Sequence, residues 1–243
     1  MKKIFYFSSI LILIFTIFSC SPALSISLKN DDSVDVQFEI TNTESFFSNF
    51  SAFMDFSEEN FYDKEILSSN LQSIGFSDIN LEIGKNADLK LFAQLNNFSQ
   101  LKEENPITSL FIKKQDSFEI SINPDNLIEV LETIPEITDY LDLLMAPVYT
   151  GEEITEQEYL ELFATVYGES FAKDFENTNF VVKINVLDKI KNIETAKDNI
   201  ASVNFEGNVA NIKIPLYKLL CNQDLTFFKI HFLKKIVTFY RTQ

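Results

Sequence analysis

Three residue types on which much enzyme chemistry depends are scarce in this 243-residue chain: five glycines, two cysteines and one histidine. The glycines are too few and too scattered to form a glycine-rich phosphate loop. The single histidine, His231, has no neighbouring motif that would indicate a catalytic triad. One histidine and one free cysteine do not supply the usual ligands of zinc. The sequence therefore predicts no cofactor, no metal site and a protein that is not an enzyme.

Basic residues are also in the minority, because 20 lysines and arginines face 36 acidic residues and the formal net charge is -16. This balance argues against nucleic acid as a partner and against adsorption of the folded body to anionic lipid headgroups. The acidic residues lack the spacing of a calcium loop. A cluster on one expected helix is the candidate acidic face for a basic partner, although its charge could instead serve solubility. This face comprises Glu152, Glu153, Glu156, Glu158 and Glu161.

The first twenty residues have the layout of a signal peptide. Lys2 and Lys3 precede an apolar run over residues 4–18, which is shorter than the about 20 residues that a spanning helix needs. The run ends in Ile17-Phe18-Ser19-Cys20, which resembles a relaxed form of the lipobox of bacterial lipoproteins. The N-terminus therefore predicts export and an address at the cell envelope.

The lipobox resemblance implies that residues 1–19 are removed and that Cys20 is acylated, which anchors the protein in a membrane facing the periplasm or the cell exterior. The alternative is ordinary secretion with cleavage after Ala23, because Ser21-Pro22-Ala23 also supplies small residues. Residues 20–32 show no sustained pattern and predict a tether that reaches about 40 Å when extended.

Beyond the tether, residues 33–224 contain alternating apolar runs that predict strands. Short polar turns at residues 84–88, 113–116 and 206–208 predict three hairpins. The order of strands and helices lacks the repeated alternation of a parallel sheet. We therefore expect an α+β fold, in which an antiparallel sheet of about seven or eight strands packs against helices. The expected strands lie at 33–41, 79–83, 89–95, 110–112, 118–122, 180–186, 203–205 and 212–214.

Helical spacing predicts one helix that ends at Gly75 and a helical insert over about 125–176, within which Thr155 and Glu158 form a capping box. A further helix is expected where phenylalanines recur at helical spacing. These phenylalanines are a candidate ligand pocket, and core packing is the alternative that we favour. They are Phe46, Phe47, Phe50 and Phe53.

The last residues, 225–243, form a basic apolar tail without acidic residues. Its spacing fits either a membrane surface or a closing strand or helix of the domain. Cys221, just before the tail, follows two leucines and is expected to be a buried small side chain rather than a reactive thiol. The basic residues of the candidate membrane-surface tail are Lys229, Lys234, Lys235 and Arg241.

The end of the domain resembles the LppM family of bacterial lipoproteins. The similarity lies in Val182-Lys183-Ile184-Asn185-Val186, in Gly207-Asn208-Val209 and in Ile212-Lys213-Ile214-Pro215-Leu216, together with the order of elements. The glycine that the family has after the first of these strands is replaced around Leu187-Asp188. The resemblance implies an α+β domain at the membrane surface that binds lipid or an envelope component. It transfers no functional residue.

Three functions follow from these observations. The first is a non-enzymatic, membrane-anchored envelope lipoprotein whose domain binds an apolar ligand such as lipid, or an envelope protein. The second is an adhesin-like surface protein that holds a basic partner with its acidic face. The third and lowest-ranked is a carboxylate-dependent hydrolase, which requires two acidic residues that converge in a cleft.

Overall fold

The structure is a computed structural model that describes residues 22–42, 63–102, 105–131, 145 and 154–233. Its strands form a seven-stranded sheet, sheet A, and a four-stranded sheet, sheet B. The predicted α+β class is therefore confirmed, with a second sheet in addition to the expected one. Sheet A has the order β3 (Phe76–Ile83), β4 (Leu89–Leu95), β2 (Val34–Ile40), β1 (Ala23–Leu28), β7 (Asn179–Asn185), β10 (Val209–Pro215) and β9 (Ser202–Glu206). Sheet B has the order β5 (Phe111–Lys113), β6 (Ser117–Ile122), β11 (Thr226–Phe232) and β8 (Ile190–Thr195).

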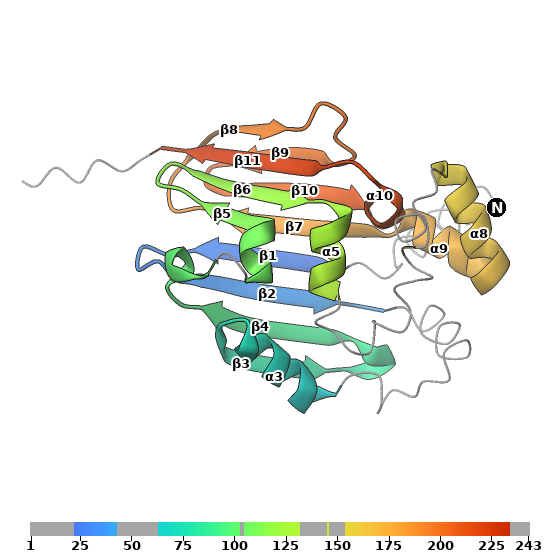
Figure 1. Ribbon diagram of the computed structural model, residues 1–243, viewed down its shortest axis with the longest axis horizontal. Helices are drawn as coiled ribbons and strands as arrows, with labels where there is room; N and C mark the ends of the chain where they lie inside the picture. Colours follow the sequence, from blue (N-terminus) through green and yellow to red (C-terminus); the bar gives the residue numbers. More distant parts are fainter. Residues whose placement is uncertain (1–21, 43–62, 103–104, 132–144, 146–153, 234–243) are drawn as a thin grey trace, which may run out of the picture.

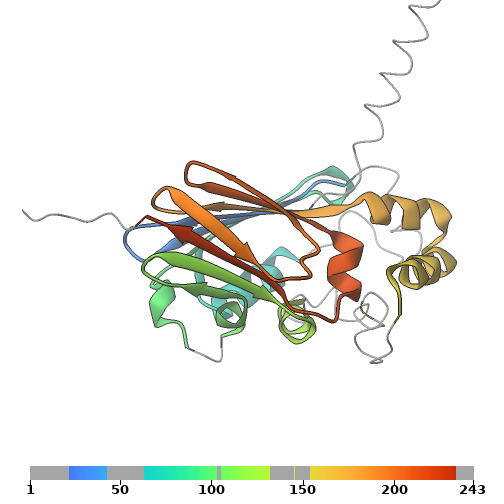
Figure 2. The same cartoon turned by 90° about the horizontal axis from the view of Figure 1, so that it is seen from above.

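The molecule has two main layers and a helical extension at one end (Figures 1 and 2). Sheet A is one layer, and sheet B with α3, α4 and α5 forms the other. The extension consists of α8 and α9 and is connected with the sandwich through α10, so we call α8 and α9 the lobe. The helices are α3 (Lys64–Ser73), α4 (Pro106–Leu110), α5 (Pro124–Leu131), α8 (Glu156–Tyr167), α9 (Glu169–Asn177) and α10 (Leu216–Cys221), with short 3-10 turns η1 (Lys85–Ala87) and η2 (Phe98–Gln100).

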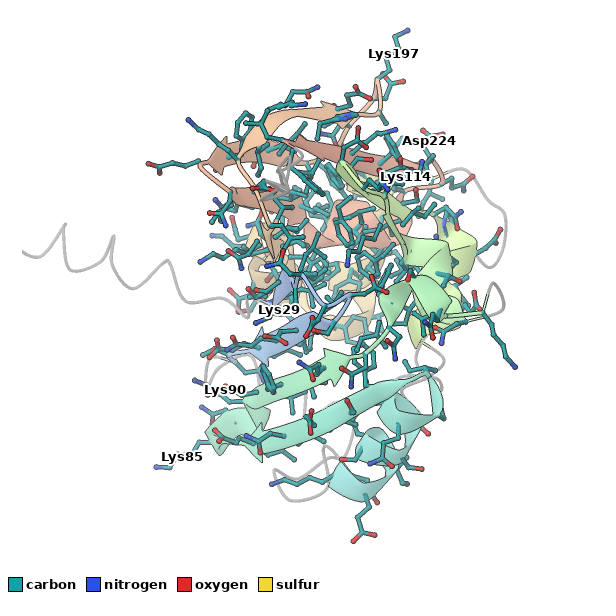
Figure 3. The ribbon with its side chains drawn as sticks, turned by 90° about the vertical axis from the view of Figure 1, so that its left-hand side faces the viewer. Lys29, Lys85, Lys90, Lys114, Lys197 and Asp224 are labelled. Atoms are coloured by element: carbon teal, nitrogen blue, oxygen red, sulfur yellow. The ribbon has the colours of Figure 1, made fainter. Side chains whose placement is uncertain are left out.

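Sheet A buries one face and exposes the other, as alternating sequences require. On β4, Leu89, Leu91 and Ala93 are buried, whereas Lys90 and Phe92 between them are exposed. Figure 3 shows Lys90 on the side of sheet A that faces away from the helices. The buried face meets sheet B and the helices in one continuous core, and the exposed face is a broad polar surface.

The predicted tether over residues 20–32 was wrong for Ala23–Leu28, which form β1 near the middle of sheet A. Leu24, Ile26 and Leu28 alternate with two serines, so this segment carries the same period-two signal as the other strands. Strand β1 pairs antiparallel with β2 and parallel with β7, where Ile26 lies opposite Ile184. Sheet A is thus antiparallel except at this one junction.

Part of the predicted basic tail belongs to the fold, because Thr226–Phe232 form β11 in the interior of sheet B. Thr226, Phe228, Ile230 and Phe232 are buried, and the strand pairs with β6 on one side and β8 on the other. These seven residues thus form a strand of the domain, which is the closing-strand alternative, and their buried side chains belong to its core.

Local signals in the sequence located most of the other elements. The three expected hairpins are β3–β4, β5–β6 and β9–β10. Helix α3 ends just before Gly75, which has a φ of 105° that L-residues rarely adopt. Helix α5 begins at Pro124, and the Asn123 side chain accepts a hydrogen bond of 2.9 Å from the Asn126 backbone N–H.

Asp32 fastens the turn between β1 and β2 to the opposite layer. Its carboxylate lies 2.8 Å from Lys113 Nζ on β5, and it accepts hydrogen bonds from the backbone N–H and the hydroxyl of Ser99. Its backbone is left-handed, with a φ of 66°. Burial opposes ionisation, but the hydrogen bonds from Lys113 and Ser99 outweigh it and lower the pKa of Asp32 to about 2.

Candidate functional site

Of the residues proposed in the sequence analysis for lipidation, a ligand pocket, the acidic face or the membrane-surface tail, three glutamates of the acidic face and Lys229 lie in the described part of the chain. Predictions on the others remain predictions. The residues outside the described ranges are Cys20, Phe46, Phe47, Phe50, Phe53, Glu152, Glu153, Lys234, Lys235 and Arg241.

The three described glutamates of the acidic face lie in the first two turns of α8 and have different roles. Glu158 closes the capping box: it accepts a 2.7 Å hydrogen bond from the Thr155 backbone N–H, while the Thr155 hydroxyl accepts one from the Glu158 N–H. The hydrogen bonds that the Glu158 carboxylate accepts from the Thr155 N–H and hydroxyl lower the pKa of Glu158. Glu161 accepts a hydrogen bond of 2.9 Å from Gln157. Glu156 instead points to another element, α10.

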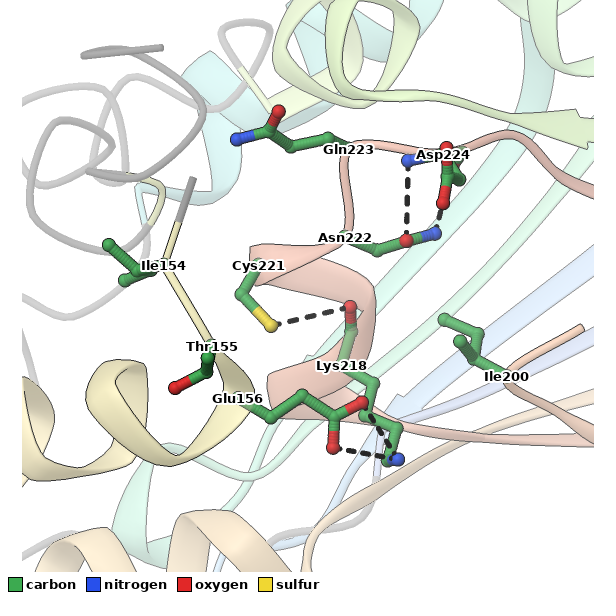
Figure 4. A pocket seen from close by; sticks show the side chains of 9 residues that line it. All are labelled: Ile154, Thr155, Glu156, Ile200, Lys218, Cys221, Asn222, Gln223 and Asp224. Atoms are coloured by element: carbon green, nitrogen blue, oxygen red, sulfur yellow. Dashed lines mark hydrogen bonds and ion pairs between the residues drawn. The ribbon is translucent and has the colours of Figure 1, made fainter. Parts of the chain in front are cut away.

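Glu156 joins the lobe to α10 through an ion pair. Its two carboxylate oxygens lie 2.9 Å and 2.8 Å from Lys218 Nζ, and the hydrogen bond to Glu156 raises the pKa of Lys218 (Figure 4). Both side chains are partly exposed, so this pair contributes little to stability. Its main effect is geometric, because it sets the position of the beginning of α8 against α10.

A cleft of about 410 Å³ opens beside this ion pair. It lies between the beginning of α8, the end of α10, the loop that leads into β11 and the loop between β8 and β9. Most of its wall is polar, so the cleft is suited to a polar or charged group rather than to an acyl chain. The lining residues are Ile154, Thr155, Glu156, Ile200, Lys218, Cys221, Asn222, Gln223 and Asp224 (Figure 4).

Cys221 lies in the wall of this cleft and is half-buried. Its thiol donates a long hydrogen bond of 3.8 Å to the Lys218 carbonyl. Burial, with a smaller effect from the Glu156 charge, raises the pKa of Cys221 to about 11. The thiol is therefore protonated at neutral pH and is a poor nucleophile, which agrees with the expectation of an unreactive side chain.

The lobe has a small hydrophobic core of its own, made mainly of aromatic rings. The ring centroids of Phe163 and Phe175 are 4.2 Å apart, those of Phe163 and Phe171 are 5.7 Å apart, and Tyr159 lies beside them with no exposed surface. On α10, the adjacent residues Leu219 and Leu220 belong to the sandwich core and to the lobe core respectively. The two cores thus meet at α10.

Lys229 and His231 lie on the outer face of sheet B, away from the cleft. The carboxylate of the buried Glu119 lies 2.9 Å from Lys229 Nζ and 2.6 Å from Lys114 Nζ. These lysines, despite some loss of solvation, lower the pKa of Glu119. His231 Nε2 lies 3.0 Å from Glu194 on β8. Lys229 is therefore part of an ion-pair cluster within the sheet and is not a free cation.

The lobe is attached at the end of sheet A where β1 begins (Figure 1). The Pro22 carbonyl accepts a hydrogen bond of 2.9 Å from the Val181 N–H on β7. Helix α9 ends immediately before β7, and the Thr178 carbonyl between them accepts a hydrogen bond of 2.9 Å from Leu216, the first residue of α10. The beginning of the folded domain, the lobe and the cleft are thus gathered at one end of the molecule.

Within the described ranges, no three acidic, histidine or cysteine side chains gather as a metal site requires. None of the helices described is both long enough and apolar enough to cross a membrane. The sequence did not indicate the cleft, because α10 has six residues and the loops around it carry no periodic signal. Among the residues that line the cleft, Thr155 was assigned to the start of a helix by a local sequence signal, the capping box.

Comparison with known proteins gives a weak structural similarity. No protein-family model and no curated protein matches the sequence. Among the solved structures, the folded domain of the LppM protein of Mycobacterium tuberculosis is a structural neighbour with 8% sequence identity and a TM-score of 0.38. The alignment covers 88% of this chain and 90% of that chain. This similarity is too low to assign the chain to the LppM family.

Proposed function

We propose that this chain is a lipid-anchored protein of the bacterial cell envelope, and that its domain is a non-enzymatic binding module. The observation that carries the proposal is the position of Cys20. Only Ser21 and Pro22 separate it from Ala23, the first residue of β1. Cleavage just before Cys20 would remove the signal peptide and keep every residue of β1 in the mature protein.

The rival cleavage after Ala23 is less compatible with this fold. It would remove Ala23, which pairs with Glu39 on β2 and Val181 on β7, and it would remove the Pro22 carbonyl that binds the Val181 N–H. Backbone hydrogen bonds of a central strand are costly to lose when the groups left behind are shielded from water. The position of β1 therefore favours Cys20 as the first residue of the mature protein.

The chemistry of the cleft supports binding rather than catalysis. Its cysteine is protonated at neutral pH, and its lysine is held in an ion pair with Glu156. Lobe carboxylates such as Glu161 and Glu169 are exposed. We infer that the domain binds a polar or basic envelope component at this end. An apolar ligand held by Phe46, Phe47, Phe50 and Phe53 remains a separate prediction.

Intact mass spectrometry of the protein from its native membrane tests this proposal, with Cys20→Ala as the control. We expect a chain that begins at Cys20 and carries two or three acyl chains, and we expect the Cys20→Ala variant to lack them. A mature chain that begins at Leu24 without acyl chains would refute the lipid anchor and make the protein a secreted one.

A further inference from the structure

The short distance between Cys20 and the fold limits how the domain can sit on a membrane. The three residue steps from Cys20 to Ala23 span at most about 11 Å even when fully extended. A tether of the length expected from the sequence would let the domain rotate freely above the bilayer, but most of that segment belongs to β1. An acylated Cys20 therefore holds the beginning of β1 within about 11 Å of the headgroups, which is about twice the spacing of neighbouring strands.

The elements around the beginning of β1 are then also close to the membrane. Val181 binds Pro22, and the chain that leads into β7 comes directly from α9. Figures 1 and 2 show the lobe extending from this end of sheet A, beyond the ends of the strands. A domain anchored beside the base of the lobe therefore keeps that base close to the bilayer.

The opposite end of the sandwich is a strand length away. Strands β1 and β7 are parallel, so both run from the anchored end to the far end, and the seven residues of β7 span about 23 Å. The turn after β7 contains the exposed Leu187, and the nearby Lys189 carbonyl accepts a hydrogen bond of 3.0 Å from the Leu233 N–H. Leu233, which follows β11, is thus also at the far end.

We infer that the lobe faces the bilayer and that the turn after β7, together with the end of β11, faces away from it. This orientation rests on the proposed lipid anchor at Cys20. It places the cleft between α8 and α10 near the membrane surface, so that its partner is a polar or basic group presented there.

The chain contains no tryptophan, so a single introduced tryptophan reports on one position alone. Leu162 on α8 and Leu187 are a matched pair, because their side chains are 41% and 37% exposed. Replacing either with tryptophan disturbs little of the core. The acylated Leu162→Trp and Leu187→Trp proteins are reconstituted on phosphatidylcholine vesicles that carry a nitroxide quencher on the headgroup. Phosphatidylcholine is used because it has no net charge and does not repel the acidic lobe.

We expect a large loss of fluorescence for Leu162→Trp and no loss for Leu187→Trp, and we expect neither to lose fluorescence when Cys20→Ala is also introduced. Equal quenching of the two positions, stronger quenching of Leu187→Trp, or no quenching of either in vesicle-bound protein would overturn the orientation while leaving the lipid anchor intact. Absence of acyl chains in the mass spectrum would instead refute the anchor, and with it the orientation. Mass spectrometry and vesicle flotation before the quenching experiment distinguish these failures.

Discussion

The sandwich and the lobe bury hydrophobic surface in different ways. The sandwich core is mainly aliphatic, with residues such as Ile26, Ile184 and Ile212 on alternating positions of long strands. The lobe core has few members and depends on stacked aromatic rings around Phe163. Two helices offer little surface, and each aromatic side chain buries about 150–250 Å². Aromatic side chains therefore give this small unit more buried area per residue than aliphatic ones would.

The comparison indicates which part of the molecule can open locally while the rest stays folded. The sandwich core is shared among two sheets and four helices, so the loss of one side chain leaves many other contacts in place. The lobe shares its core with the sandwich mainly through α10, where Leu219 and Leu220 belong to different clusters. We expect the lobe to open locally at a lower free energy than the sandwich unfolds. The same lobe carries the acidic face and one side of the cleft.

The sharpest test of this difference compares one core substitution in each region. Phe163→Ala is expected to destabilise the lobe by about 4 kcal/mol, and Ile184→Ala the sandwich by about 3 kcal/mol. Hydrogen exchange followed by mass spectrometry should show faster exchange confined to α8 and α9 for Phe163→Ala. Ile184→Ala should accelerate exchange in both regions, because the lobe has no anchor once the sandwich opens. Equal acceleration everywhere in Phe163→Ala would mean that the molecule is a single cooperative unit.

A polar substitution in the sandwich should have a smaller effect that depends on pH. The folded pKa of Asp32 is about 2, below the 3.8 of a free aspartate, so its ionisation stabilises the fold above about pH 4 and this contribution disappears as the pH falls through 2. Asp32→Asn keeps the shape and tolerates the left-handed backbone. Because Asp32 is about one-third exposed, we expect a loss of about 1–2 kcal/mol at pH 7.

Urea unfolding at pH 7 and near pH 2 measures this loss. The difference between Asp32→Asn and the natural protein should shrink as the pH falls. Asp31→Asn is the matched control, since it removes the same charge at the preceding position but breaks only the local hydrogen bonds from Ser33. A loss for Asp32→Asn that does not change with pH would mean that the charge is not responsible.

The smallest expected effect concerns the beginning of the lobe. Thr155→Ala removes the capping box of α8 and should destabilise that helix by about 1 kcal/mol. Thr165→Ala, in an exposed position of the same helix, is the control and should be neutral or slightly stabilising, because alanine has the higher helix propensity. Exchange of the first-turn amides of α8 reports the difference. If both variants behave alike, the ion pair between Glu156 and Lys218, rather than the cap, fixes the start of the lobe.

Much of the local structure was predictable because its causes lie within a few residues. The hairpin turns, the stop of α3 at Gly75 and the cap at Thr155 follow from turn and capping chemistry. The candidate site was less predictable. Glu156 was identified as acidic and helical, but nothing nearby in the chain indicates that it binds Lys218, which lies more than sixty residues further on. The cleft itself is made by loops that have no periodic signal.

The sequence by itself determined which residues are buried, because alternation along a strand and spacing along a helix decide which face is apolar. Tertiary structure alone decided which strands are neighbours. Ser27 and Asn185 are 158 positions apart, yet the Asn185 amide donates a hydrogen bond of 3.0 Å to the Ser27 hydroxyl across the parallel junction of β1 and β7. A period-two pattern predicts which face of a strand is buried but not which strand pairs with it, since any apolar strand of similar length could be the neighbour. Only the tertiary structure therefore decided the junction that joins β1 to β7 and, through it, to the lobe.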